Sequence, residues 1–297
     1  MVATRLAVAL VAGVVILSTA GLSSQQDRVP DILARAREAI GGEGRLRNVQ
    51  SLSLEAKALR RSAPRMRVTA DSAVPLAWSQ EEYRVTVEIV LPDRFVVRRN
   101  PGGAMETEDG VNGSQLIAKA RGETRRVIGP NAAERFAELQ QREFLRFMLA
   151  CLLVAPDQYG VRFSDGGPAT VDGTPAHFIE ATGGANLAVR MFFDKQGRLL
   201  ALRDRERGAA PRATPQPAAP ENQAAKDVPV FRSLEGGPPP GPPMGVYQVR
   251  GGDYRPVAGI SFPHLIVIDR NDYDHSEWRV SRVRVNPKID LKHFDPK

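Results

Sequence analysis

The chain has 297 residues, enough for one large domain or two small ones, and its single cysteine, Cys151, excludes a disulfide scaffold. Its 41 Lys and Arg residues outnumber its 34 Asp and Glu residues and give a net charge of +7. The arginines are spread through many segments, so this charge indicates a solvated basic face and no nucleic-acid partner. Peripheral contact with an anionic membrane surface is the second interpretation.

The N-terminus has the pattern of a secretory signal peptide. A cationic residue precedes the uncharged run 6–17, and Ser18 and Ala20 fit positions −3 and −1 of a cleavage site. The run is shorter than the about 20 residues that a membrane span needs. We therefore expect residues 1–23 to be removed and residues 24–297 to form one domain in the periplasm. An uncleaved N-terminal anchor is the alternative.

The first expected helix covers residues 29–40. Its apolar residues recur at spacings of three and four, which places them on one face. Pro30 suits the first helical turn, and the glycines at 41 and 42 end the helix.

Period-two alternation then predicts strands that pair in an antiparallel sheet with one apolar and one solvated face. The dipeptides Asp109-Gly110 and Asn112-Gly113 are expected at turns. The alternating segments are 52–58, 83–89, 95–98 and 116–118.

A second helix is predicted for residues 131–154. From Phe144 onward it is apolar almost all round except at Arg146, so it must be covered on most sides. Cys151 lies in this dense apolar run and is expected to be a buried, inert thiol.

Strands return after this helix and close the chain. Turns are expected at Asp172-Gly173 and at residues 195–197. Residues 208–243 contain ten of the 23 prolines and predict a flexible insertion between strands, with a polyproline ligand for a partner as the alternative. The expected strands are 161–163, 169–172, 176–181, 187–193, 198–204, 245–250, 260–269 and 277–285.

The sequence has no local pattern of catalytic or metal-binding residues. Its four histidines lack the spacing of a zinc site, and no nucleophile elbow is present. The acidic segment 269–277 lacks the glycine and closing glutamate of an EF-hand loop and is expected to be a hairpin turn. We therefore expect no enzymatic activity, no metal and no cofactor. The histidines are His177, His264, His275 and His293.

Several segments in order along the chain resemble the LolA/LolB-like outer-membrane lipoprotein-carrier superfamily. They are ILARAREAIGGEGRLRNVQSLSLEA, PDRFVVRR, VDGTPAHFIEA, VRMFFDKQGRLLAL, DYRPVAGISFPHLIVID and EWRVSRVRVNPKIDLKHFDPK. The resemblance implies an α+β fold in which a curved antiparallel sheet forms a half-open β-barrel and helices cover its apolar concave face. The insertion at 208–243 is not typical of the carriers.

The resemblance also implies a non-enzymatic periplasmic carrier that binds a lipid or an acylated lipoprotein by its acyl chains, with residues 144–152 as the lid. The alternative is a structural or interaction protein with a filled core, bound to an envelope partner through the Pro-rich loop. Alternation leaves open whether Met191 and Phe193 or instead Phe192 face the hollow. The candidate cavity residues are Phe95, Val97, Phe144, Phe147, Met148, Leu152, Phe178, Met191 and Phe193.

Overall fold

The structure is a computed structural model. The expected signal peptide and the Pro-rich insertion lie outside the residues that it describes. The described residues are 28–62, 66–68, 73–75, 79–101, 105–125, 129, 131–204, 247–270 and 274–296.

The described residues form three α-helices, two short 3-10 helices and fifteen strands. The helices are α2 (Arg28–Ala39), α3 (Glu43–Arg47), α4 (Ala132–Leu152), η1 (Asp157–Tyr159) and η2 (Leu291–Phe294). The strands before α4 are β1 (Ser51–Ser62), β2 (Met66–Val68), β3 (Ala73–Pro75), β4 (Ser79–Val90), β5 (Arg94–Asn100), β6 (Thr107–Asn112), β7 (Gln115–Ala120) and β8 (Glu123–Thr124). Those after α4 are β9 (Arg162–Val171), β10 (Thr174–Gly183), β11 (Leu187–Phe193), β12 (Leu199–Asp204), β13 (Tyr247–Val257), β14 (Ile260–Arg270) and β15 (Asp274–Val285).

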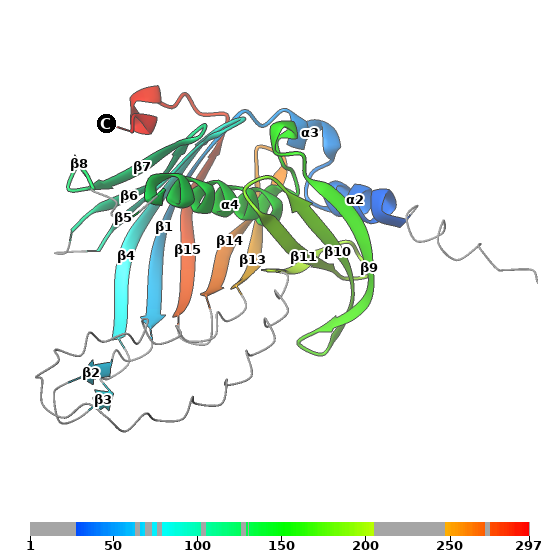
Figure 1. Cartoon of the computed structure of the whole chain (residues 1–297). Coiled ribbons are helices and arrows are strands. Elements are labelled where there is room, and N and C mark those ends of the chain that lie inside the picture. Colours follow the sequence, from blue (N-terminus) through cyan, green and yellow to red (C-terminus); the bar gives the residue numbers. More distant parts are fainter. Residues whose placement is uncertain are drawn as a thin grey trace, which may run out of the picture.

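Thirteen of these strands form one antiparallel sheet in the order β8-β7-β6-β5-β4-β1-β15-β14-β13-β12-β11-β10-β9. The first long strand, β1, lies inside the sheet between β4 and the last strand, β15. The two ends of the sheet, β8 and β9, do not pair with each other, so the sheet stays open. Figure 1 shows that it curves around α4, while α2 lies at the β9 end. The predicted α+β fold with a curved, half-open antiparallel sheet is confirmed.

Alternation along the central strands decides which side chains enter the core. Leu52, Leu54 and Ala58 of β1 are buried on the concave face, as are Val87 of β4 and Trp278 of β15. The register of β1 against β15 shifts between residues 55 and 56 of β1, where β15 has one extra residue, and this bulge raises the local twist of the sheet. The period-two pattern of the sequence thus predicts the apolar side of these strands correctly.

Helix α4 crosses the concave face, and its second half is covered on all sides. All nine residues from Phe144 to Leu152 are buried, including Arg146 and Cys151. Burial also raises the pKa of the Cys151 thiol, which keeps it protonated and unreactive. The helix ends at Leu153, which adopts the left-handed conformation, and the carbonyl of Leu153 accepts a 3.0 Å hydrogen bond from Arg37 of α2. The predicted second helix is confirmed to within two residues at each end.

The prediction of a turn at Asp109-Gly110 was wrong. Both residues lie inside β6, and the turn that leads to β7 is at Asn112-Gly113, as predicted for that dipeptide. A Cβ atom at Gly110 would lie 2.0 Å from the carbonyl oxygen of Phe95. The glycine is therefore required by the close approach of β5 and not by a turn.

The segment predicted as two short strands, 161–163 and 169–172, forms the single edge strand β9 (Arg162–Val171). Its pairing with β10 shifts between Phe178 and Ile179, where Gly166 provides the extra residue. The ring of Phe178 occupies the space that a Cβ atom at Gly166 would need. One strand with a glycine bulge therefore replaces the predicted pair. The predicted hairpin turns at Asp172-Gly173 and at residues 195–197 are confirmed.

The convex face is less uniformly solvated than the alternation predicts. Phe294 of η2 packs against Val96 and Ile117 there, and all three are fully buried. The C-terminal segment is fixed at its start by Asn286, whose side chain accepts a 2.7 Å hydrogen bond from the amide of Gln50 and donates one of 2.8 Å to the carbonyl of Asn48. The chain end is therefore a structural cover for β5 to β7.

Candidate functional site

The concave face divides into an apolar half and a polar half. Eight of the nine predicted cavity residues lie together in the apolar half, around α4 and β11. The ring of Phe95 lies 5.7 Å from that of Phe144 and 6.5 Å from that of Phe147. The helix and the sheet thus pack directly on each other in this half. A role of these side chains in lining a ligand cavity stays a prediction.

Phe178 is the predicted residue that lies elsewhere. Its ring packs 5.6 Å from that of Phe192, in a small cluster that the main core does not include. Met191 and Phe193 face the main core, which settles the alternative that the sequence leaves open for β11. Because Ile179 and Ala181 of β10 face the concave side, the alternation places Phe178 on the convex side.

The polar half begins where the inward rows of several strands change from apolar to charged or hydroxyl-bearing residues, at a different register position on each strand. Val97 of β5 is followed two residues later by Arg99, and Ile268 of β14 by Arg270. The same change occurs on the neighbouring strands, so charged and hydroxyl groups line this half. These inward residues are Arg60, Tyr83, Arg99, Tyr247, Arg270 and Asp274.

Helix α4 contributes a buried polar cluster to the boundary between the halves. Arg146 binds Glu143 at 2.6 Å, also binds Asp204 of β12, and stacks 3.9 Å from the ring centre of Tyr247. The Tyr247 hydroxyl donates a 3.0 Å hydrogen bond to Glu143. Burial raises the pKa of Tyr247, with a further contribution from Glu143, so this hydroxyl remains a donor at neutral pH. These contacts join α4 to β12 and β13.

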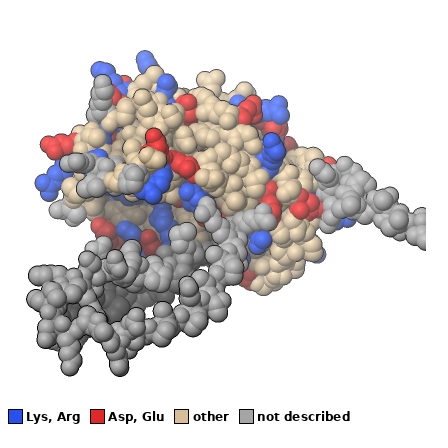
Figure 2. All heavy atoms as spheres, viewed as in Figure 1, with Lys and Arg blue, Asp and Glu red and all other residues tan. Residues whose placement is uncertain are grey.

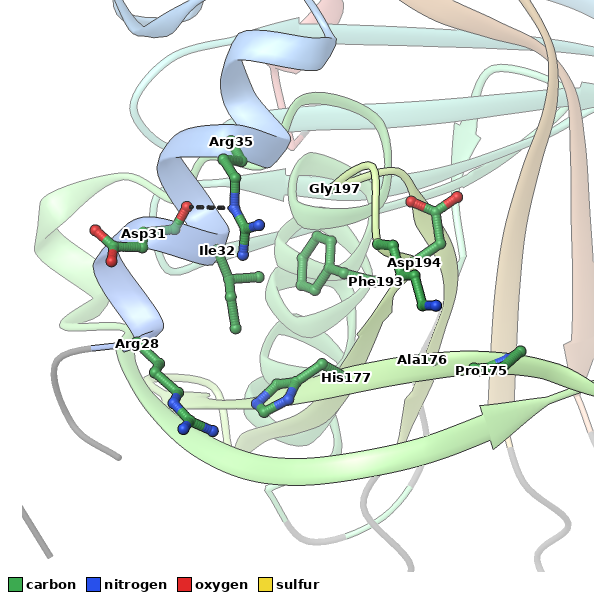
Figure 3. A pocket seen from close by; sticks show the side chains of 11 residues that line it. Arg28, Asp31, Ile32, Arg35, Pro175, Ala176, His177, Phe193, Asp194 and Gly197 are labelled. Carbon is green, nitrogen blue, oxygen red and sulfur yellow. Dashed lines mark hydrogen bonds between the residues drawn. The ribbon is translucent and has the colours of Figure 1, made fainter. Parts of the chain in front are cut away.

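A pocket of about 480 Å³ lies beneath the first half of α2, next to β10 and the turn between β11 and β12. Ile32 and Phe193 form its apolar floor, together with Pro175 and Ala176 of β10 (Figure 3). Phe193 is thus one of the predicted cavity residues that lines an open pocket in this structure. Gly197 closes the turn at a positive φ of 80°, and it lies so close to the backbone of Ala36 that a Cβ atom would approach it at 3.1 Å.

The rim of this pocket is cationic. Arg28, Arg35 and Lys195 line it and form no ion pair within the described part of the chain. The Nε of Arg35 donates a 3.4 Å hydrogen bond to the backbone carbonyl of Asp31, shown as a dashed line in Figure 3. Asp194 does not neutralise the rim, because its carboxylate is already bound by the side chain of Arg198 at 2.7 Å. The carboxylate of Asp31 also lines the pocket, so an apolar floor is combined with three cations and one carboxylate besides that of Asp194.

His177 completes the pocket wall and is held by a carboxylate. Its Nε2 atom lies 2.5 Å from Oδ1 of Asp165, whose other oxygen is buried without a hydrogen-bond partner among the described residues. His264, His275 and His293 each contact a different oxygen, so the histidines are not brought together. Within the residues that the structure describes, no three His, Cys, Asp or Glu side chains are grouped as metal ligands would be.

The sequence interpretation missed both the pocket rim and the polar half. The signal for the polar half was present in the alternation, which continues past Val97 to Arg99 and past Val85 to Tyr83. No sequence pattern predicted the pocket rim. Arg28 and Lys195 are about 170 residues apart in the sequence, and they line the same pocket only because α2 packs there. No helix in the described part of the chain is both long and apolar enough to span a membrane.

Among solved structures, three proteins are similar to this chain over most of its length. The chain is similar to a LolA superfamily protein from Nitrosomonas europaea, with 13% identity, 90% of this chain and 96% of that chain covered, and a TM-score of 0.43. It is also similar to a DUF1329 family protein from Desulfovibrio piger (11%, 91% and 97%, 0.47) and to a domain from Vibrio parahaemolyticus named for outer membrane lipoprotein sorting (11%, 92% and 97%, 0.41).

No family profile and no curated protein matches the sequence. At these identities the similarity concerns the fold alone.

Proposed function

We propose that the protein is a non-enzymatic periplasmic carrier that binds an anionic amphiphile, either a lipid or an acylated lipoprotein, on the concave face of its sheet. The observation that supports this is the pocket beneath α2, with Ile32 and Phe193 on its floor and unpaired cations on its rim. Its volume lies within the range of about 300–1,000 Å³ for small-molecule sites. Each buried methylene of an acyl chain contributes about 0.8 kcal/mol.

In this proposal the apolar chain enters between α2 and the sheet, and the anionic end stays at the rim. Residues 144–152 of α4 remain the proposed lid, because they belong to the same core cluster as Phe193. Movement of α4 would extend the pocket along the apolar half. That movement would break the few polar contacts that join α4 to β12 and β13.

The first experiment is native mass spectrometry of the protein purified from its own envelope. We expect an added mass in the range of a phospholipid or a lipopeptide. Uptake of a fluorescent fatty acid by the delipidated protein is measured in parallel. Absence of both the added mass and the uptake would contradict the proposal.

A second experiment tests the rim. K195E should weaken binding of the fluorescent fatty acid about fivefold, because one exposed charge contributes up to about 1 kcal/mol. Binding of the methyl ester of the same probe should not change, because the ester carries no charge. K57E is the matched control, since Lys57 is exposed on the convex side of β1. If K195E weakened the binding of the acid and of the ester equally, the rim would not recognise the anionic end of the ligand.

The alternative function, an envelope interaction protein that binds its partner through the Pro-rich loop, is distinguished by deleting residues 208–243. The carrier should still take up the fatty acid after the deletion. An interaction protein of this kind should lose its partner and should show no uptake in either form.

A further inference from the structure

His177 lies on the inward row of β10, in the pocket beneath α2. Its direct partner in the β10–β11 ladder is Phe193, which faces the same side of the sheet. The ring lines the pocket together with Arg28 and Ile32 of α2, and Figure 3 shows these side chains around one space. Because the side chain of His177 is 25% exposed, a ligand in the pocket can reach the ring.

The partner that holds His177 is a buried carboxylate. Asp165 pairs with Ile179 in the β9–β10 ladder, so it also faces the concave side, and only 4% of its side-chain surface is exposed. Its Oδ1 lies 2.5 Å from Nε2 of His177 and accepts a 2.9 Å hydrogen bond from the amide of Gly167. No Lys or Arg among the described residues forms an ion pair with Asp165. Because a buried charge needs a partner, a proton on His177 is what this part of the chain offers to neutralise the carboxylate.

This contact fixes how the ring presents itself to the pocket. A carboxylate only accepts, so Nε2 carries the hydrogen and Nδ1 is the nitrogen left for a ligand; no described residue bonds to Nδ1. In a neutral ring Nδ1 is an acceptor, which repels the oxygen atoms of an anion. In a protonated ring Nδ1 carries a hydrogen and donates. The same side chain therefore disfavours an anion in one charge state and binds it in the other.

The other charged groups around His177 come from α2, β9 and the turn between β11 and β12. Carboxylate, arginine and lysine side chains ordinarily keep their charge between pH 6 and pH 8, whereas histidine changes its charge in this range. Figure 2 shows basic and acidic side chains intermixed over the visible face, so the attraction of an anion to this pocket depends on groups close to it. These groups are Arg28, Asp31 and Arg35 of α2, Asp165 of β9, and Asp194 and Lys195 of the turn.

We propose that His177 binds the anionic end of the ligand through Nδ1, as an imidazolium, with Asp165 as its positioning residue. Binding of the anion and protonation of the ring then favour each other, because linkage between two binding events is reciprocal. The affinity of the pocket for an anionic amphiphile therefore falls as the pH rises from 6 to 8. The inference rests on the proposed function, since it names the group of the same pocket that recognises the charged end.

The test is isothermal calorimetry of the full chain with decanesulfonate, below its critical micelle concentration, at pH 6 and at pH 8. The sulfonate keeps its charge over this range, and decanol is the uncharged probe of the same chain length. Wild type should bind the sulfonate about fivefold more weakly at pH 8, because one charge-assisted hydrogen bond is lost as the ring loses its proton. Its affinity for decanol should be the same at both pH values.

H177Q should abolish this pH dependence, because glutamine does not change its charge. Its affinity for decanesulfonate at pH 6 should be close to that of the wild type at pH 8. Unchanged binding of decanol shows that the pocket of the variant is folded. D165N should reduce the pH dependence without abolishing it, because the ring remains but asparagine has no negative charge to favour its protonated form.

H275Q is the matched control. Nδ1 of His275 lies 2.6 Å from a carboxylate oxygen of Asp269, and the ring is on the convex side of β15, away from the pocket. H275Q should keep the full pH dependence of decanesulfonate binding.

Three results overturn the inference and leave the proposed carrier function intact: sulfonate binding that does not change with pH in the wild type, a pH dependence that persists in H177Q, or one that is lost equally in H275Q. If the wild type bound neither decanesulfonate nor decanol at either pH, the proposed function would be contradicted together with this inference. The two failures are therefore distinguishable.

Discussion

Replacing Arg146 with methionine tests whether the polar cluster holds α4 on the concave face. The change removes the ion pairs to Glu143 and Asp204 and the stacking on Tyr247, but it keeps an apolar stem of similar length. The other buried residues of the second half of α4 are left in place. A loss of stability would therefore report the ion pairs and the stacking of the guanidinium group, and not the packing of the apolar stem.

The expected cost follows from the exposure of the partners. Arg146 has only 5% of its side-chain surface exposed, whereas Asp204 keeps 32% and Glu143 keeps 21%. Removing one member of a fully buried pair costs about 3–5 kcal/mol, because the partner is left charged and unpaired. Water can reach both carboxylates here, so we expect the lower end, about 3 kcal/mol.

Urea denaturation followed by circular dichroism measures this free energy. D204N and the double variant complete a cycle in which the coupling between the two residues should be about 1–2 kcal/mol. R135M is the control, since Arg135 is exposed on the same helix and forms no ion pair with a described residue. If R146M were as stable as the wild type or more stable, desolvation of the arginine would outweigh its contacts, and the reasoning would be refuted.

Three further predictions concern the ends of the described chain. F294A should lower the free energy of unfolding by about 3–5 kcal/mol in urea denaturation, because the fully buried ring covers β5 to β7; an unchanged midpoint would mean that η2 is not a cover. N286A should cost about 1–2 kcal/mol in the same assay through its lost hydrogen bonds to residues 48, 50 and 51, and a loss no larger than that of an exposed control would contradict this. Although burial opposes it, Arg47 and Arg37 lower the pKa of Glu43, so its contribution to stability should be present above the unfolded pKa and disappear as the pH falls through the lowered one. The thermal midpoints of E43Q and wild type should therefore converge at acid pH, and a constant difference would exclude this linkage.

Much of the local structure could be predicted from the sequence. The apolar residues of α2 recur at the period of a helix, and those of β1 recur at the period of a strand. Both periods are set by backbone geometry, so they can be recognised in the sequence. The end of α4 is apolar on all sides, which indicates a covered helix. The prediction of a turn at Asp109-Gly110 was wrong, because a glycine can also be required where two strands approach closely. Phe178 was grouped with the cavity candidates by its residue type, whereas the structure places it in a separate cluster with Phe192.

The sequence by itself determined that the chain forms an amphipathic antiparallel sheet and an apolar helix that other elements must cover. Only the tertiary structure decided what surrounds each charge. Arg28 and Lys195 line one pocket, although they are separated by more than 160 residues. The reason is physical: alternation fixes the side of a strand, whereas the order of strands and the position of the helices fix which side chains meet.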